Sequence, residues 1–593
     1  MLSCPFRSSF SHPPSSPSFL SLHRTSAPHP CHCAPRLCSP LLSAIAVTFR
    51  PLPAFLPVSW PPHSARDLLA ALLASPLIRI SLCSSCHLSL PFLPSSPPPF
   101  PMSPPHCLPP QGVALVPGVT PTSCELLTTP QLHWLVWAAN RQPPASPLLP
   151  SEDLYFSTLA SAFKALLPAS SPSPSPSPSP AASPAPAPFP APFPCPPLLV
   201  DAANGVGAPK LQRLVEEVRG RAGVALAVAV RNTGGEGEGE LNEGVGADFV
   251  QKEQRAPRGF GGDADMAHRW VGAQVGGRTG GWAHRCVSLD GDADRLVYFF
   301  HSPPSPTTTT ATATASQPAC TPDSAPPTFH LLDGDKIAAL FTSFLVHTLR
   351  AISPSQPPPP ASASALPPCA WFALPSFRPI SLGVVQTAYA NGASTAYVAW
   401  QLGCAPAVAR TGVKHVHAVA EQWDVGVYFE ANGHGTVLFA EELLAWLQAQ
   451  TEKGLPEGSA LQRLAALSML CNQAVGDALA NVLAVEAVLR CHGWSHHEWS
   501  RMYHDLPSRQ LKVRVAERGM FVPCGDDTRL LEPTSLQATI DAAVAGVAGG
   551  RAFVRPSGTE DVVRVYAEAA TQEAADALAR TVAAAVEQQS PVQ

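Results

Sequence analysis

The amino-terminal part of the chain carries very little charge. No lysine precedes Lys164 and no acidic residue precedes Asp67 in a chain of 593 residues. Residues 1–111 are instead rich in proline, serine, histidine and cysteine, with short apolar patches and little periodicity. A segment of this composition buries too little apolar surface to offset the entropy lost on folding. We therefore predict that residues 1–111 form no folded domain.

Three origins of residues 1–111 remain open. The first is an organellar transit peptide, because the segment is rich in serine, carries arginine and lacks acids over its first 66 residues. The second is a disordered tail. The third, which we favour, is translated non-coding sequence from a wrong gene model, because prolines and histidines scattered through apolar patches suit neither targeting nor packing.

Long apolar runs are also absent, so we expect no segment that spans a bilayer. The formal net charge of −5 gives no sign of a nucleic-acid partner. Cys31 with Cys33, and Cys83 with Cys86, lack a second ligand pair at the spacing that a zinc site requires. The other cysteines lie in apolar contexts, which is typical of a reduced, cytoplasmic protein.

Proline is abundant, with 70 residues, and it is concentrated in tracts. Beyond the amino-terminal segment, such tracts occupy residues 168–197, 302–327 and 353–368. Each tract lies between segments with the periodicity of helices or strands, so we expect linkers or surface loops there.

The remaining sequence alternates strand and helix patterns, which predicts an α/β fold. We expect strands at residues 198–200, 224–230, 286–289, 296–300, 384–387, 425–429 and 436–439, and helices at 152–167, 211–218, 336–349, 393–402 and 441–490. The block 508–593 mixes strands and helices and predicts a small, separate α+β unit.

Three carboxylates alternate between two apolar strands at Asp290, Asp292 and Asp294. Oxygens brought together in this way repel each other unless a hard cation lies between them. Three carboxylates also leave coordination positions open for a substrate phosphate. A solvated acidic turn is the alternative, but the flanking strands and the adjacent Arg295 favour a metal–phosphate site.

A second polar loop, Glu430-Ala431-Asn432-Gly433-His434-Gly435, joins two apolar strands. Its acid, amide and histidine could hydrogen-bond the vicinal hydroxyls of a sugar. The alternative is an ordinary hairpin loop.

The loop Arg555-Pro556-Ser557-Gly558-Thr559-Glu560, with Arg564 close behind, lies between the last strands. Guanidinium groups, hydroxyls and exposed backbone N–H groups suit a phosphate dianion. A β-turn capped by serine and threonine is the alternative.

Two further segments have weaker chemical signals. Residues 411–417 contain Lys414 and His415, and the lysine could add positive charge beside a phosphate. Asp201, at the end of a strand and ahead of a helix, is expected to be a helix cap.

In this order, these segments resemble the α-D-phosphohexomutase superfamily. The resemblance is carried by residues 128–136, 201–208, 241–250, 290–295, 333–336, 411–417, 430–435 and 555–564, and residues 127–133 and 429–435 favour its phosphoacetylglucosamine mutase branch. The resemblance implies a multi-domain, heart-shaped enzyme with three related α/β domains and a smaller C-terminal α+β domain. It also implies interconversion of N-acetylglucosamine 6-phosphate and N-acetylglucosamine 1-phosphate on the route to UDP-N-acetylglucosamine.

The resemblance also assigns residues to roles. Asp290, Asp292 and Asp294 would bind Mg²⁺, and Glu430, Ala431 and Asn432 would bind the sugar. The phosphate that does not react would be held by Arg555, Pro556, Ser557, Gly558, Thr559 and Arg564, with Arg295, Lys414, His415 and His434 as further candidates. The expected partners are small molecules, namely the phosphorylated sugar and its bisphosphate intermediate, with no nucleic acid and no membrane.

The same resemblance predicts a domain division. It consists of a low-complexity segment (1–111), a remnant of the first α/β domain (112–167), a linker (168–197), a second α/β domain with the metal loop (198–333), a third with the sugar loop (334–460) and a C-terminal phosphate-binding domain (461–593).

One family motif is missing from the sequence. The superfamily's nucleophile lies in a loop Thr-Ala-Ser-His-Asn-Pro, and the most similar string is Phe10-Ser11-His12-Pro13-Pro14, without the strand before it or the polar turn after it. Three hypotheses follow: an active mutase whose gene model is wrong at its 5′ end, an inactive homologue that still binds sugar phosphate, or a phosphoglucomutase or phosphomannomutase with another sugar preference.

Overall fold

The computed structural model describes residues 124, 126–141, 150–168, 197–223, 226–260, 285–302, 328–353, 371–558 and 560–590. Across these ranges, no helix is both long enough and apolar enough to cross a membrane. The segment 1–111 and most of the predicted proline-rich tracts lie outside the described residues.

The first sheet has five strands in the order β2-β1-β3-β4-β5. The strands are β1 (Leu198–Asp201), β2 (Val228–Arg231), β3 (Arg285–Leu289), β4 (Leu296–Ser302) and β5 (Thr328–Leu332). β1 is parallel to β2 and β3, whereas β4 is antiparallel to β3 and β5. β3 and β4 are therefore a hairpin, and the three aspartates form its connection.

Helices cover both faces of this sheet. One face packs in the main hydrophobic core with α3 (Thr129–Arg141), α4 (Glu152–Leu166) and α5 (Gly207–Ala222). The other face packs against α6 (Ala247–Glu253) in a smaller cluster around Phe299.

The second sheet has the order β10-β9-β7-β6, with β8 paired to β7. Its strands are β6 (Trp371–Phe372), β7 (Ile380–Thr387), β8 (Ala407–Ala409), β9 (Val425–Phe429) and β10 (Gly435–Phe439). It packs on α8 (Gly334–Ile352) in the main core and on α10 (Val413–Ala420) in a separate cluster. These two mixed sheets with their helices confirm the predicted α/β class.

The predicted helical region 441–490 is confirmed, and the structure divides it into three helices. These are α11 (Glu441–Glu452), α12 (Ala460–Leu470) and α13 (Ala478–His492). Gly454, Pro456 and Gly458 interrupt the helical pattern before α12, and Asp477 caps α13 by accepting from the N–H of Ala480. The predicted helix 393–402 is likewise a short α9 (Gly392–Ala396) followed by a π-helix (Tyr397–Gln401).

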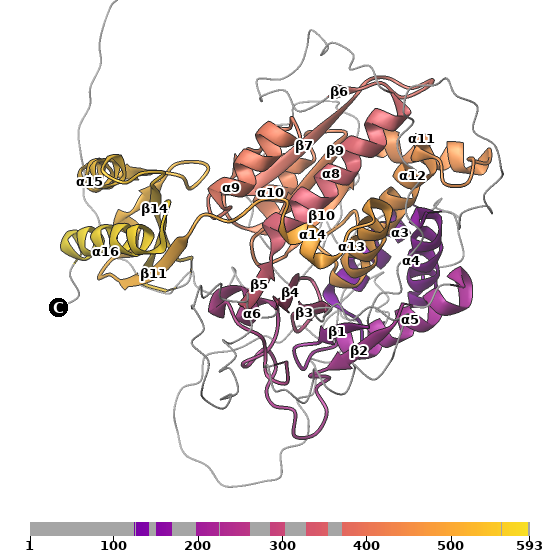
Figure 1. Cartoon of the computed structure of the whole chain (residues 1–593), viewed down its shortest axis with the longest axis horizontal. Helices are drawn as coiled ribbons and strands as arrows, with labels where there is room; N and C mark the ends of the chain where they lie inside the picture. Colours follow the sequence, from indigo (N-terminus) through magenta and orange to yellow (C-terminus); the bar gives the residue numbers. More distant parts are fainter. Residues whose placement is uncertain are drawn as a thin grey trace, which may run out of the picture.

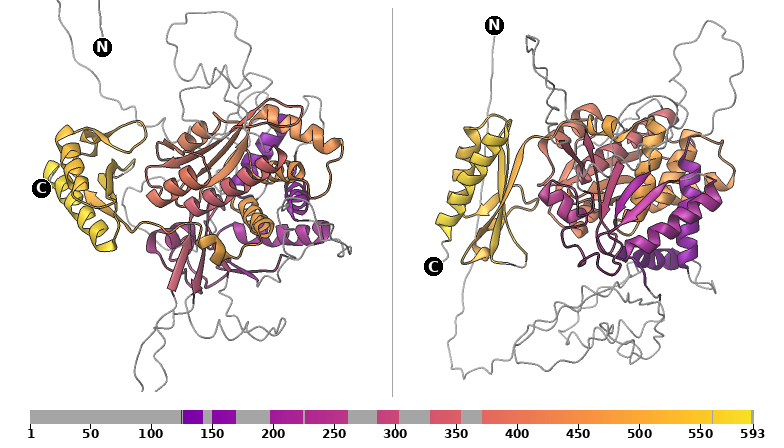
Figure 2. Two further views of the ribbon diagram at one scale, coloured as in Figure 1. Left: turned by 45° about the horizontal axis from the view of Figure 1, so that its top comes forward. Right: turned by 60° about the horizontal axis from the view of Figure 1, so that its bottom comes forward.

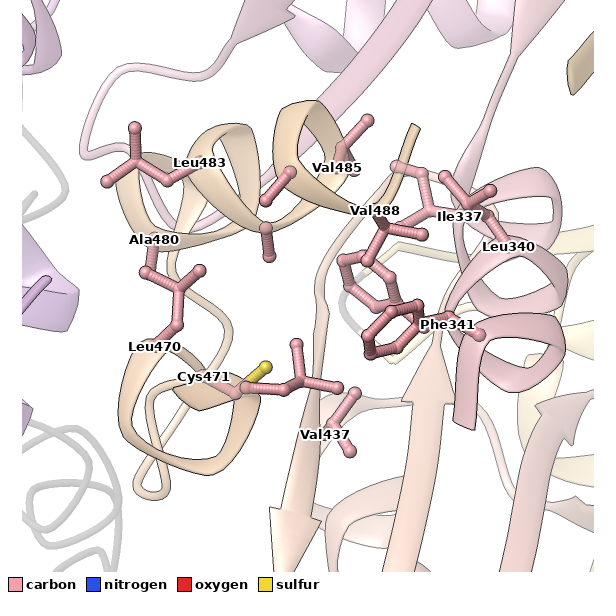
Figure 3. Close-up of a cluster of buried hydrophobic side chains, with 14 of the residues drawn as sticks. Ile337, Leu340, Phe341, Val437, Leu470, Cys471, Ala480, Leu483, Val485 and Val488 are labelled. Carbon is pink, nitrogen blue, oxygen red and sulfur yellow. The ribbon is translucent and has the colours of Figure 1, made fainter. Parts of the chain in front are cut away.

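The main core is shared between both sheets and these helices. Figure 3 shows α12 and α13 packing against α8 and β10, with Phe341, Val437, Leu470 and Val488 directed into one cluster. α13 is buried on almost every side, so it lies inside the core and not on its surface. A short helix, α14 (His496–Ser500), follows it.

The C-terminal part is a separate unit with its own core (Figures 1 and 2). A three-stranded sheet in the order β11-β15-β14 packs against α15 (Thr534–Ala545) and α16 (Gln572–Gln589). The strands are β11 (Ser508–Arg514), β14 (Arg551–Pro556) and β15 (Val562–Glu568), and β12 (Val522–Pro523) pairs with β13 (Leu530–Glu532). α12 and α13, which the predicted domain division assigns to this unit, contribute side chains to the main core.

Candidate active site

The three aspartates lie on the tight connection between β3 and β4. Leu289 pairs with Leu296 across the hairpin, and the chain turns through Ala293, whose φ is +59°. Asp290 Oδ1 accepts hydrogen bonds from the backbone N–H groups of Asp294 (3.0 Å) and Arg295 (3.1 Å). One oxygen from each of Asp290, Asp292 and Asp294 lies within 4.8 Å of the other two.

The charges of this loop are strongly coupled. Burial raises the pKa of Asp290 well above its usual value, and the carboxylates of Asp294 and Asp292 add to that rise. Burial, followed by repulsion from Asp292, raises the pKa of Asp294 to about 6. Asp294 Oδ1 is buried and lacks a hydrogen-bond partner. A hard cation at this point would relieve the repulsion and supply the missing partner.

Arg295 connects the metal loop to α6. Its Nη1 donates to Asp248 Oδ1 at 3.1 Å, and its Nε lies 3.3 Å from Asp294 Oδ1. Asp248 was not singled out in the sequence, because its partner lies 47 residues away and only the fold brings them together.

The sugar loop, residues 430–435, is in direct contact with the metal loop. Arg295 and His434 form an isolated antiparallel bridge, and the N–H of Leu296 donates to the carbonyl of Gly433 at 3.4 Å. His434 Nδ1 lies 3.3 Å from Asp294 Oδ2. Gly433 has a φ of +86°, and a Cβ there would lie 1.8 Å from the carbonyl oxygen of Leu296. This close approach requires glycine.

The polar groups of the sugar loop are partly committed to holding its shape. Glu430 Oε1 accepts from the N–H of Gly412 at 2.8 Å, and Asn432 Oδ1 accepts from the N–H of His434 at 3.2 Å. The carbonyl of Ala431 accepts from the N–H of Gly334 at 3.3 Å. Burial raises the pKa of Glu430, and hydrogen bonding from Gly412 opposes that rise. The second carboxylate oxygen of Glu430 and the Asn432 amide group therefore remain the groups best suited to a ligand.

His434 is held as a neutral imidazole. Burial, followed by the charge of Arg295, lowers its pKa to about 4. Its Nε2 is buried and has no hydrogen-bond partner. A neutral ring with one unused nitrogen can accept or donate a single hydrogen bond in the site.

The phosphate loop connects β14 to β15. The N–H of Ser557 donates to the carbonyl of Val562 at 2.8 Å, which closes the turn, and Arg555 lies opposite Arg564 in the strand register. The Nε of Arg564 is buried and lacks a hydrogen-bond partner. Pro556 ends β14 and Gly558 lies within the turn, whereas Thr559 lies outside the described residues.

Asp527 links the phosphate loop to the rest of the site. Its Oδ2 accepts from Arg555 Nε at 2.9 Å and from the backbone N–H of Thr411 at 3.0 Å. The residue is fully buried and adopts a φ of +63° in the turn between β12 and β13. Sequence reasoning missed Asp527. The only local signal is the Gly525-Asp526-Asp527 turn, and Thr411 lies 116 residues away.

The predicted segments therefore form one continuous chain of contacts. It runs from the metal loop through His434 to the sugar loop, from Glu430 to Gly412, and from Thr411 through Asp527 to the phosphate loop. Lys414 is exposed in the first turn of α10, next to this chain. The pKa of His415 is lowered by burial and by the charges of Lys414 and Arg410.

Two aspartates from the motif segments have structural partners. The expected cap at Asp201 is wrong, because α5 begins at Gly207 without a side-chain cap. Asp201 accepts instead from the N–H of Gly246 (2.7 Å) and from Ser288 Oγ (2.8 Å). These hydrogen bonds join the end of β1 to β3 and to the start of α6, next to the metal loop. Asp333 caps α8 by accepting from the N–H groups of Asp335 and Lys336.

Within the described ranges, no serine that directly precedes a histidine is identified as the nucleophile. Their one Ser-His dipeptide is Ser495-His496, and Ser495 forms a capping box with Glu498 at the start of α14. Ser11 lies outside the described residues.

Comparison with known families matches two parts of the chain. Residues 371–494 match the family described as phosphoacetylglucosamine mutase AMG1, domain III, and residues 511–585 match the phosphoglucomutase/phosphomannomutase C-terminal domain. The chain is 42% identical over 482 residues to the phosphoacetylglucosamine mutase of Arabidopsis thaliana, covering 80% of this chain and 71% of that one. It is 36% identical over 465 residues to the Homo sapiens protein of the same name, covering 78% and 69%.

Solved structures agree with the sequence matches. The Aspergillus fumigatus N-acetylphosphoglucosamine mutase, in complex with GlcNAc-6P and magnesium, superposes with a TM-score of 0.61 at 36% identity and covers 81% of this chain and 74% of that one. An N-acetylglucosamine-phosphate mutase in its substrate complex superposes with a TM-score of 0.58 at 33% identity, covering 79% and 71%. The resemblance seen in the motifs is thus confirmed by fold and by identity along most of the chain. The chain belongs to the phosphoacetylglucosamine mutase family of the α-D-phosphohexomutase superfamily.

Proposed function

We propose that this protein interconverts N-acetylglucosamine 6-phosphate and N-acetylglucosamine 1-phosphate, a step that supplies UDP-N-acetylglucosamine synthesis. The observation that carries this proposal is the direct contact between the metal loop and the sugar loop through Asp294 and His434. A site of this kind brings a cation next to a sugar hydroxyl, which is where phosphoryl transfer takes place.

The metal-loop residues fit Mg²⁺. Asp290, Asp292 and Asp294 would hold it, because three converging hard oxygens match its preference and the buried Asp294 Oδ1 accepts no hydrogen bond. When bound, Mg²⁺ supplies positive charge that stabilises the oxygens of a transferring phosphoryl group.

The sugar and its non-reacting phosphate would bind on either side of residues 411–412. Glu430, Ala431 and Asn432 would bind ring hydroxyls, because their loop faces the metal loop and is fixed by its own hydrogen bonds. Arg555, Pro556, Ser557, Gly558, Thr559 and Arg564 would hold the phosphate. Arg295, Lys414, His415 and His434 flank this path and would add charge or single hydrogen bonds.

This arrangement suits a substrate that must bind in two orientations. The metal loop and the phosphate loop lie at opposite ends of the contact chain, and the sugar loop lies between them. A sugar phosphate turned end for end would still present hydroxyls to Glu430 and Asn432 and a phosphate to Arg564. The protein's own contribution is therefore to position the substrate and to balance its charge.

A second candidate function is binding of sugar phosphate without turnover. The observation that favours it is the absence of a Thr-Ala-Ser-His-Asn-Pro string from all 593 residues. A phosphohexomutase relay begins at a nucleophile that accepts and returns the phosphoryl group. A third candidate is mutase activity with another hexose phosphate as the preferred substrate.

One set of measurements separates these functions. Turnover of N-acetylglucosamine 6-phosphate and glucose 6-phosphate is followed by phosphorus NMR, and binding of both is measured by calorimetry with Mg²⁺ present. The proposed function predicts turnover that is faster with the acetylated sugar and abolished in Asp292→Asn, but retained in the surface variant Asp576→Asn. Binding without turnover would support the second candidate, and faster conversion of glucose 6-phosphate the third. A peptide with a Ser-His-Asn-Pro loop in protein isolated from its own cells would also exclude the second.

We also propose that the protein is cytoplasmic and that its α/β part divides into 112–167, 198–333 and 334–460. The predicted start of the last domain at residue 461 is not kept, because α12 and α13 pack in the main core and the C-terminal core begins in β11. The cytoplasmic location is supported by the cysteines of the described ranges, because no disulfide joins them. Fractionation of cells followed by immunodetection tests the location, and limited proteolysis with mass spectrometry tests the boundaries.

A further inference from the structure

The segment Ala388–Gly392, which leads from β7 into α9, contacts the C-terminal unit. We call this segment the seat. Arg551 of β14 donates from Nη1 to the carbonyl of Ala388 (2.8 Å) and from Nη2 to the carbonyl of Ala390 (2.6 Å). The N–H of Gly392 donates to Glu568 Oε2 of β15 at 3.1 Å. Both strands that flank the phosphate loop are therefore hydrogen-bonded to this seat.

The seat is built to hold the two strands closely. Arg551 Nε donates to Glu568 Oε1 at 2.8 Å, so the two side chains that reach the seat also bind each other. A Cβ at position 392 would lie 2.4 Å from Glu568 Oε1, so any other residue there would displace this carboxylate from its hydrogen bonds. Asn391 is itself fixed by hydrogen bonds to Leu506 in the connection that leads into β11.

Tyr389 is the one aromatic side chain that the seat presents to the C-terminal unit. Its ring meets Phe553 of β14 edge-on at 5.0 Å and Tyr566 of β15 at 5.9 Å. Phe553 and Tyr566 stack on each other at 5.2 Å, so the three rings form one cluster across the two units. Aromatic pairs of this geometry fix relative orientation as well as burying area.

The hydroxyl of Tyr389 lies beside the cations of the phosphate loop. It is buried, and the Arg555 side chain lies within its hydrogen-bonding reach. Burial raises the pKa of Tyr389, and the charges of Arg555 and Arg564 oppose that rise. Arg555 and Arg564 face each other in the strand register, so both guanidinium groups lie near this hydroxyl.

We propose that Tyr389, a residue of the large body, is a positioning residue for the phosphate-binding arginines of the C-terminal unit. Its ring fixes β14 and β15 on the seat, and its hydroxyl, together with Asp527, orients the guanidinium of Arg555 toward the phosphate. Phosphate binding by the C-terminal loop then requires the two units to be docked. This inference rests on the proposed function, because it deepens the role assigned to the phosphate loop.

The test replaces Tyr389 with phenylalanine, which keeps the ring cluster and removes the hydroxyl. We expect the Kd for N-acetylglucosamine 6-phosphate, measured by calorimetry with Mg²⁺ in the full chain, to rise about tenfold, the loss of one hydrogen bond to a charged group. The matched control is Tyr397→Phe, because the Tyr397 ring packs on Tyr503 and its pKa is raised by burial alone. That control should bind as the unmodified protein does.

A double-mutant cycle distinguishes positioning from a general structural role. If Tyr389 acts through Arg555, Tyr389→Phe should have no further effect in an Arg555→Ala background. Unchanged binding by Tyr389→Phe alone, or a loss of equal size in both backgrounds, would overturn the inference. Failure of the unmodified protein to bind N-acetylglucosamine 6-phosphate would instead overturn the proposed function, and the same variants titrated with inorganic phosphate would then decide the role of Tyr389.

Discussion

Replacing Arg285 with methionine should destabilise the large body by about 3–5 kcal/mol, because it leaves a buried carboxylate without its cation. Arg285 begins β3, the strand that leads into the metal loop, and its Nη1 donates to Glu486 Oε2 on α13. The two side chains are only 9% and 1% exposed. Burial alone would raise the pKa of Glu486, but the charges of Arg285 and Arg490 bring it below its usual value.

The double variant Arg285→Met with Glu486→Leu is the matched control. It removes both charges and keeps apolar volume, so its free energy of unfolding should lie within about 1–2 kcal/mol of the unmodified protein. The double variant should then be about 1–4 kcal/mol more stable than Arg285→Met alone. Because the pKa of Glu486 is lowered on folding, the contribution of the pair is present above about pH 4.5 and is lost as the pH falls below that value.

Urea denaturation followed by tryptophan fluorescence is the appropriate assay. No tryptophan follows Trp499, so tryptophan emission does not come from the C-terminal unit. Trp499 is itself buried next to Tyr298 and His496, close to the ion pair. A double variant as unstable as Arg285→Met would refute the reasoning, because the loss would then come from packing and not from the unpaired charge.

Gly433→Ala should raise the Kd for N-acetylglucosamine 6-phosphate by about tenfold or more, because a Cβ 1.8 Å from the carbonyl of Leu296 forces the sugar loop away from the metal loop. Calorimetry measures this, and an unchanged Kd would count against the contact. Asp292→Asn should weaken Mn²⁺ binding, measured by electron paramagnetic resonance, by about tenfold or more, because it removes one of three anionic ligands; equal affinity would place the metal elsewhere. Burial lowers the pKa of His496 to about 3 and so keeps the ring neutral in the folded protein. The unfolded chain therefore binds more protons than the folded protein below pH 6.5, and the free energy of unfolding decreases as the pH is lowered. His496→Leu should remove about 1.4 kcal/mol per pH unit of that fall between pH 6 and 4, and parallel stability curves would contradict this.

The chemical loops were predictable because their signals are local. Alternating aspartates between two apolar runs predict a loop on a strand hairpin, and Asp290, Asp292 and Asp294 lie on one. The sugar and phosphate loops were found in the same way, since each is polar and lies between two antiparallel strands. The roles of their individual residues stay predictions.

What the sequence could not predict depends on distant pairing. Asp527 bonds Thr411 across 116 residues, and Arg285 bonds Glu486 across 201. Neither pairing has a periodic pattern that identifies it, because the partners meet only when separate elements pack. The same limit explains Asp201, which looks like a helix cap locally but binds Ser288 87 residues away.

A crystal structure of the protein with Mg²⁺ and N-acetylglucosamine 6-phosphate tests the central claim most directly. The account predicts the ion between Asp290, Asp292 and Asp294, sugar hydroxyls within hydrogen-bond distance of Glu430 and Asn432, and a phosphate at Ser557 and Arg564 when it does not face the metal. A sugar phosphate bound elsewhere, or an ion away from the three aspartates, would contradict it.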